Sequence, residues 1–67
     1  MMEESDSLVP LADVESIVGL KKTTLYKMIH GRTFPSPIKI GAAARWSRRE
    51  VSAWIEAQKA AARATAG

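Results

Sequence analysis

The sequence contains no cysteine and only one histidine, His30. Without thiols the chain has neither a disulfide framework nor a zinc site with thiolate ligands, and one histidine cannot hold a metal ion alone. No apolar run approaches the ~20 residues of a membrane-spanning helix, and the N-terminus is acidic where a signal peptide would be basic. We therefore expect a cytoplasmic protein that binds no metal and is held together by its apolar core.

A catalytic set of residues is also missing. The sequence shows no paired carboxylates in a plausible pocket, no nucleophile with a partner base and no glycine-rich loop for a phosphate. A chain of 67 residues buries only roughly 60% of the surface that its unfolded form exposes, which leaves room for one small domain and no deep cleft. We expect no enzymatic activity and no cofactor.

Acidic residues are absent from a long central block, residues 21–49, which holds eight lysine or arginine residues. The first 20 residues show the reverse, with five acids and no base, although the net charge of the whole chain is only +3. A basic block free of acid is typical of a surface that binds a polyanion. The other interpretation is a solvated basic face without a partner, but acids normally alternate with bases on such faces.

Two short helices are predicted on either side of a glycine. Apolar residues recur on one helical face over residues 11–18, and Gly19 ends that helix. A second periodic run predicts a helix over residues 22–30, ended by His30 and Gly31. Only about three residues separate the two helices, which is the sequence form of a helix-turn-helix.

A small β-hairpin and a third helix are expected to follow. Residues 38–46 contain alternating β-branched residues and predict a two-stranded hairpin with Gly41–Ala44 at its tip. Ser47 and Glu50 have the spacing of a capping box, in which the serine accepts from the N–H three residues on and the glutamate reaches back. The third helix is expected to extend to about Ala60, with Trp46 and Trp54 in the core.

The predicted fold class is therefore mostly α with a small β-hairpin, a winged helix-turn-helix in the order helix, turn, helix, hairpin, helix. The predicted DNA-binding domain spans residues 8–60. We expect residues 1–7 to form a disordered acidic arm and residues 61–67 to form a flexible alanine-rich tail.

The solvent face of the second helix is the predicted DNA-reading surface, because its N-terminal residues would enter the major groove. Basic residues of the hairpin, of the loop before it and of the third helix would add phosphate or minor-groove contacts. The candidate DNA-binding residues are Lys22, Thr23, Thr24, Tyr26, Lys27, Arg32, Lys39, Arg45 and Arg48.

Structural interpretations exist for several of these residues. Thr23 or Thr24 could satisfy N–H groups at the helix start, and the lysines could be ordinary solvated side chains. Tyr26 could lie partly buried under the wing. His30 fits a residue near the C-terminal dipole of the helix better than a ligand or an acid–base group.

Four stretches of the chain resemble the AlpA family of small phage-associated regulators, which is related to excisionases and to the MerR-type winged helix. They are residues 11–14 (LADV), 18–29 (VGLKKTTLYKMI), 34–41 (FPSPIKIG) and 45–55 (RWSRREVSAWI). The resemblance implies a winged-helix fold whose second helix and wing bind DNA. By position it makes Lys22, Thr23, Thr24, Tyr26 and Lys27 recognition-helix residues and Arg45 a wing residue.

The sequence departs from the family pattern at two places. Lys21 stands where the family usually has a serine that starts the second helix, and lysine cannot cap a helix by accepting a hydrogen bond. The loop Gly41–Ala44 is less basic than is common in the family.

Our first hypothesis is a sequence-specific regulator that binds double-stranded DNA in the bacterial cytoplasm, associated with the nucleoid. An excisionase-like directionality factor that bends DNA would use the same surface, and a protein-interaction adaptor or packaging subunit is the alternative from another class. The expected partners are DNA, other copies of the chain on repeated sites, and integrase or RNA polymerase.

Overall fold

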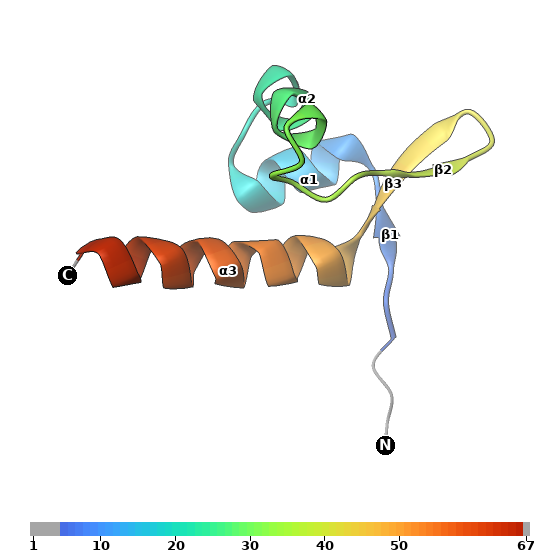
Figure 1. The fold of residues 1–67 in the computed structure, drawn as a ribbon. Coiled ribbons are helices and arrows are strands. Elements are labelled where there is room, and N and C mark those ends of the chain that lie inside the picture. The colour runs from blue at the N-terminus through green and yellow to red at the C-terminus, as the bar shows by residue number, and fades with distance from the viewer. Residues whose placement is uncertain (1–4, 67) are drawn as a thin grey trace.

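In the computed structural model, which describes residues 5–66, three helices lie beside a small antiparallel sheet, and the hairpin of the sheet projects away from them (Figure 1). The elements are β1 (Leu8–Val9), α1 (Leu11–Val18), α2 (Lys22–His30), β2 (Ile38–Ile40), β3 (Ala43–Ser47) and α3 (Arg48–Ala66). The predicted fold class is confirmed, because this mostly helical arrangement with one hairpin is compatible with a winged helix-turn-helix. Residues 1–4 of the predicted acidic arm and Gly67 of the predicted tail lie outside the described residues.

Helices α1 and α2 have the bounds that the apolar spacing predicts. Val14 of α1 and Leu25 of α2 are fully buried, which shows that the predicted apolar faces point into the core. Gly19 ends α1 in the left-handed conformation, with φ 76°, and its N–H donates to the carbonyl of Glu15 at 2.8 Å. This positive φ explains the glycine, because other residues adopt the left-handed region at a cost.

The sheet has one strand more than the sequence predicts. β1 pairs with β3, so that the strand order is β1-β3-β2 and β3 lies in the centre. Val9 faces Trp46 across this ladder. Two residues are too few to show the alternation of apolar and polar side chains that identifies a strand in a sequence. β1 is therefore recognised only from its pairing with β3.

The tip of the wing, which we define as β2, β3 and their connecting turn, is shorter than predicted. Ile40 pairs with Ala43, which leaves Gly41 and Ala42 as a two-residue turn. Gly41 has φ 60°, as the first central residue of a type II′ hairpin turn requires. The predicted tip Gly41–Ala44 is therefore corrected: Ala43 and Ala44 belong to β3, because pairing with β2 overrides the low strand propensity of alanine.

Two tryptophan side chains attach the α2–β2 connection to the rest of the core. The indole N–H of Trp46 donates to the carbonyl of Pro35 at 3.1 Å, and that of Trp54 donates to the carbonyl of Thr33 at 2.7 Å. Phe34, between these two acceptors, is buried and packs edge-on against Trp54 with ring centroids 4.9 Å apart. The predicted core position of both tryptophans is confirmed, with Trp46 fully buried and Trp54 half-buried.

α2 ends in a Schellman motif whose left-handed residue is an arginine. The N–H of Thr33 donates to the carbonyl of Met28 at 2.8 Å, and the N–H of Arg32 donates to the carbonyl of Ile29 at 3.0 Å. Arg32 has φ 62°, whereas the preceding Gly31 has φ −82°. The position that glycine commonly occupies in this motif is thus taken by a residue with a Cβ atom.

The start of α3 is capped by two separate segments of the chain. Ser47 accepts a hydrogen bond from the N–H of Glu50 at 3.1 Å, as the capping box predicts. No hydrogen bond from Glu50 back to Ser47 is seen within the described residues. Instead Asp6 accepts from the Ser47 hydroxyl and, at 3.1 Å, from the N–H of Arg49. The described end of the predicted arm is therefore attached to the first turn of α3.

α3 continues to Ala66, six residues beyond its predicted end at about Ala60. Only its first turns pack against the core, through Val51, Trp54 and Ile55. The remaining part extends away from the body of the molecule (Figure 1). This part of α3 is rich in alanine, which has the highest intrinsic helix propensity, so it can remain helical without packing against the core.

Replacing Arg32 by glycine should stabilise the protein by about 1 kcal/mol, because glycine adopts the left-handed region without the steric cost of a Cβ atom. Chemical denaturation of the wild type and of Arg32→Gly measures the difference. Arg32→Ala is the matched control, because it removes the same charge and keeps the Cβ atom. An equal gain in both variants would show that the charge, not the backbone, is responsible.

The cap formed by Asp6 predicts a pH-dependent stability. Hydrogen bonds from the Ser47 side chain and from the N–H of Arg49 lower the pKa of the Asp6 carboxyl below its ordinary 3.8. The stabilisation is therefore complete above about pH 5 and is lost as the pH falls below 3.8 and through the lowered pKa. The unfolding free energy of the wild type should exceed that of Asp6→Asn at neutral pH, and the gap should narrow in acid. A gap that is the same at both pH values would contradict this assignment.

Candidate nucleic-acid interface

The exposed face of α2 is made of lysine, threonine and histidine side chains and contains no acid. Leu25 is fully buried, and Met28 and Ile29 are half-buried against the core. The helical period then turns the intervening residues outward. The exposed side chains of α2 are those of Lys22, Thr23, Thr24, Lys27 and His30.

Tyr26 has a different position from its neighbours on α2. Its side chain is half-buried, and its ring meets that of Trp46 edge-on, with centroids 6.2 Å apart and planes at 75°. The ring of Tyr26 is therefore partly buried, as the structural interpretation of this residue expects. The ring joins α2 to β3, so Tyr26 helps to set the angle between the helix and the wing.

The N-terminus of α2 has no side-chain cap. Lys21 occupies the N-cap position, where its carbonyl accepts from the N–H of Leu25 at 2.9 Å but its side chain accepts nothing. No acid lies in the first turn, and no hydrogen bond from a hydroxyl of Thr23 or Thr24 to the helix start is found among the described residues. The free N–H groups and the positive end of the helix dipole are thus open to an external anion.

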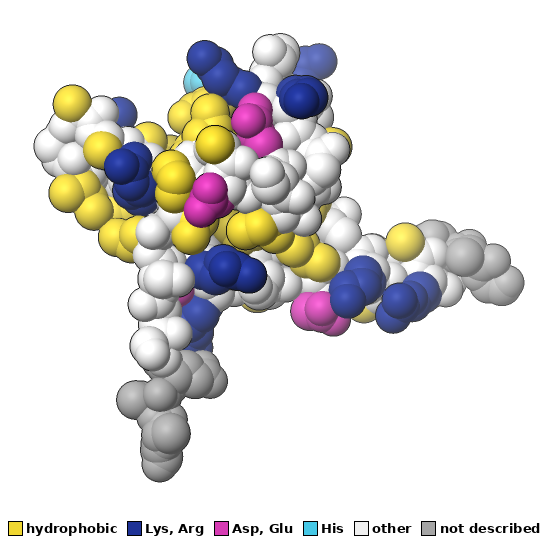
Figure 2. Space-filling view, turned by 180° about the vertical axis from the view of Figure 1, so that it is seen from behind, with side chains coloured by type: hydrophobic (Ala, Val, Ile, Leu, Met, Phe, Trp, Pro, Cys, Tyr) yellow, Lys and Arg dark blue, Asp and Glu magenta, His cyan; other side chains and the backbone are white. Residues whose placement is uncertain are grey.

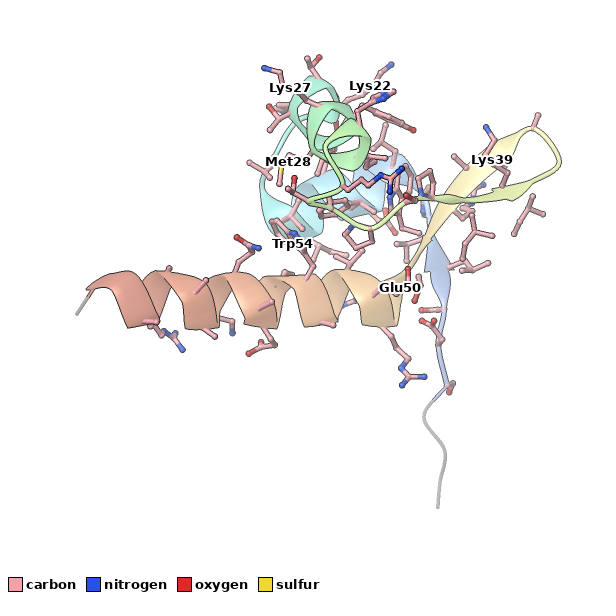
Figure 3. All side chains as sticks on the ribbon, viewed as in Figure 1. Lys22, Lys27, Met28, Lys39, Glu50 and Trp54 are labelled. Carbon is pink, nitrogen blue, oxygen red and sulfur yellow. The ribbon has the colours of Figure 1, made fainter. Side chains whose placement is uncertain are left out.

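The wing places its two predicted basic residues on opposite faces. Lys39 pairs with Ala44, whereas Arg45 pairs with Ile38, the next residue pair along the ladder. Because successive side chains of a strand alternate between the two faces, Lys39 and Arg45 point away from each other. Figure 3 shows Lys39 pointing to the same side of the molecule as Lys22 and Lys27. Arg45 is half-buried on the other face, where its Nη1 donates to the carbonyl of Ala44 at 3.0 Å.

The two other predicted contacts, Arg32 and Arg48, are both exposed but lie in different places. Arg32 follows α2 directly, at the end of its exposed face. Arg48 begins α3, where its N–H donates to the carbonyl of Ser7 at 2.8 Å. α3 lies on the opposite side of α1 from α2 (Figure 1), so the structure does not bring Arg48 to the lysines of α2.

The surface that the structure assembles consists of the exposed face of α2, its open N-terminus and Lys39, and we call it the α2–wing surface. Its lysines have no carboxylate within ion-pair distance among the described residues, where the recorded pair is Lys59–Glu56 at 2.8 Å in α3. Within the described residues no recorded ion pair therefore neutralises these lysines. Lysines without a carboxylate partner attract anions.

The described residues include no cluster of three or more histidine or acidic side chains that could hold a metal ion. None of the helices in the described part of the chain combines the length and the apolar character that crossing a membrane would require.

Sequence reasoning missed the apolar face of the wing. Leu8, Ile38 and Ile40 are the exposed large hydrophobic residues of the described chain, with 44%, 42% and 53% of their surface accessible. The alternation Ile38-Lys39-Ile40 signals a strand with one apolar face. It could not show that this face lies away from the core.

The family described as prophage CP4-57 regulatory protein (AlpA) matches residues 7–59, which is most of the 67-residue chain. No curated protein and no solved structure matches the chain significantly. The match includes every element from β1 to the packed part of α3.

Replacing Lys21 by serine should raise the unfolding free energy by about 0.5–1 kcal/mol, because the hydroxyl can accept from a free N–H at the start of α2. Thermal or chemical denaturation measures the gain. Lys21→Ala serves as the control, because it removes the same charge without supplying an acceptor. If alanine stabilises the protein as much as serine, relief of repulsion with Lys22 accounts for the effect and the cap does not.

Proposed function

Because the chain belongs to the AlpA family of prophage regulatory proteins, we propose that it regulates transcription by binding specific sequences of double-stranded DNA. The proposal places α2 in the major groove and the wing on the backbone or in the minor groove. The observation that carries it is the α2–wing surface, on which lysines from two separate elements point to the same side with no acid among them.

The dimensions of α2 suit this role. Its nine residues span roughly 14 Å, and the major groove of B-DNA is about 12 Å wide and admits one helix. A helix of this length reaches few base pairs. Useful specificity then needs more than one copy of the protein on repeated sites.

The exposed residues of α2 have the chemistry to combine positioning with sequence reading. The ammonium groups of Lys22 and Lys27 can pair with phosphate or with N7 and O6 of guanine, and the threonines can donate to phosphate or present a methyl group to thymine. The free N–H groups at the start of α2 add a phosphate site. Tyr26, held by Trp46, acts mainly by orienting α2 toward the wing.

Lys39 extends the same surface onto the wing. A lysine there can contact a phosphate one groove away from α2, which orients the protein without reading bases. The DNA contacts of Arg32, Arg45 and Arg48 stay predictions. Arg45 and Arg48 lie away from the α2–wing surface, so the proposal does not depend on them.

The test is a fluorescence-anisotropy titration with DNA that flanks the gene, repeated at several salt concentrations. For Lys27→Ala we expect roughly tenfold weaker binding, and the log–log salt slope should become shallower by about 0.9, the value for one lost phosphate contact. Lys59→Ala is the matched control, because Lys59 is exposed on α3 and paired with Glu56, away from the α2–wing surface. It should bind as the wild type does.

Equal weakening by both substitutions would show a nonspecific effect of charge and would contradict the assignment to α2. Absent binding, or equal affinity for any duplex, would point to another partner for the basic block. Strong bending of attachment-site DNA without an effect on a promoter would instead identify a recombination directionality factor that uses the same surface.

A further inference from the structure

The face of the wing opposite Lys39 carries an apolar patch around one cation. Ile38 and Ile40 flank Lys39 on β2, so their side chains point to the face opposite Lys39. Arg45 pairs with Ile38 and therefore shares its face. Leu8 pairs with Ser47, two residues after Arg45 on β3, and lies on that face as well. Figure 2 shows hydrophobic side chains gathered over the wing. We call these four residues the wing patch.

The proposed DNA-binding mode leaves the wing patch uncovered. Lys39 points with Lys22 and Lys27 toward the proposed DNA (Figure 3), so the wing patch points away from it. A contiguous group of exposed apolar side chains on a small soluble domain commonly marks a contact with another protein. The guanidinium of Arg45 has no carboxylate partner among the described residues, which favours an occupant that supplies one.

Another side of the molecule, at the α1–α2 turn, offers a carboxylate beside apolar surface. A hollow of about 380 Å³ lies between α1 and the α1–α2 turn, and we call it the α1 shoulder. Glu15 in this hollow is half-buried, and no partner for its carboxylate is recorded in the described structure. The residues that line it are Ala12, Glu15, Ser16, Gly19, Leu20 and Lys21. Leu20 and Ala12 offer apolar surface beside the carboxylate, although Lys21 adds a cation at the rim.

We propose, building on the proposed function, that copies on neighbouring DNA sites contact one another head to tail, with the wing patch of one copy on the α1 shoulder of the next. Arg45 then pairs with Glu15 of the neighbouring copy, and Ile40 enters its hollow. The wing and the α1–α2 turn lie on opposite sides of α2, although α3 extends beyond the turn (Figure 1). The contact reaches Lys21, the N-cap residue of α2, but it leaves the exposed side chains within α2 free in both copies and can repeat along DNA.

The helical repeat of DNA sets the spacing at which this contact should form. One turn of B-DNA measures about 34–36 Å. Copies one turn apart would present α2 to the same side of the duplex. Four side chains cover far less than the roughly 800 Å² per partner of a stable complex, so the contact should form only where DNA holds two copies side by side.

The test compares duplexes with one or two copies of the best site obtained by selection from random DNA. With two sites spaced by one helical turn, the wild type should bind the pair at least tenfold more tightly than independent sites predict. With sites one and a half turns apart this cooperativity should disappear. Single-site affinity reports the proposed function separately, so its loss would be a failure of that proposal and not of the contact between copies.

A charge exchange identifies the two surfaces. Arg45→Glu and Glu15→Arg should each abolish the cooperativity, so that paired sites are bound as independent sites are. The double variant should restore the cooperativity, because every contact between copies then regains opposite charges. Ile40→Ser, which changes an exposed side chain outside the core and the α2–wing surface, should lower cooperativity and leave single-site affinity unchanged.

Three results would overturn the proposal: independent binding by the wild type at every spacing, a double variant that does not recover cooperativity, or an Ile40→Ser variant as cooperative as the wild type. Thermal denaturation of each variant shows whether it is folded at the assay temperature. An unfolded Glu15→Arg variant would leave the decision to Ile40→Ser and the spacing series.

Discussion

Trp46 is fully buried in the central strand, and its indole N–H donates to the carbonyl of Pro35. Through this one side chain the sheet, the α2–β2 connection and, by the edge of Tyr26, helix α2 are held together. A chain of this size has few apolar side chains to bury, so one large ring with a satisfied N–H group contributes much of its core. The angle between α2 and the wing, on which the proposed DNA contact depends, follows from that ring.

The second constraint is the junction where β3 becomes α3. Ser47 ends the strand and caps the helix, and Asp6 reaches the same helix start from the other end of the sequence. A carboxylate at this place is favoured by the positive end of the helix dipole. Because β1 pairs with β3 just beside it, the N-terminal segment and α3 form one unit that supports the sheet from the side opposite the α2–wing surface.

These constraints divide the small surface into parts with different chemistry. One side presents lysines from α2 and the wing, and we infer that it meets DNA. The reverse of the wing is apolar, and the α1 shoulder on the other side of α2 contains a carboxylate. A regulator that reads few base pairs per copy gains specificity when adjacent copies assist one another, and this division of surfaces allows such assistance without blocking α2.

Much of the fold could be predicted from the order of residues. The apolar period determined α1 and α2, Gly19 determined the end of α1, and Ser47 determined the start of α3. The acid-free block and the exposed face of α2 also follow from the sequence, because the positions of Leu25, Met28 and Ile29 leave only one face for solvent. Local spacing suffices in these cases since neighbours within one turn of a helix decide them.

Only the tertiary structure decided the rest. β1 exists because β3 lies beside it, and Asp6 caps a helix that begins 42 residues later in the chain. Lys39 and Arg45 look alike in sequence, yet the register of the ladder sends them to opposite faces. Such features depend on which distant segments meet, and one-dimensional periodicity contains no information on that.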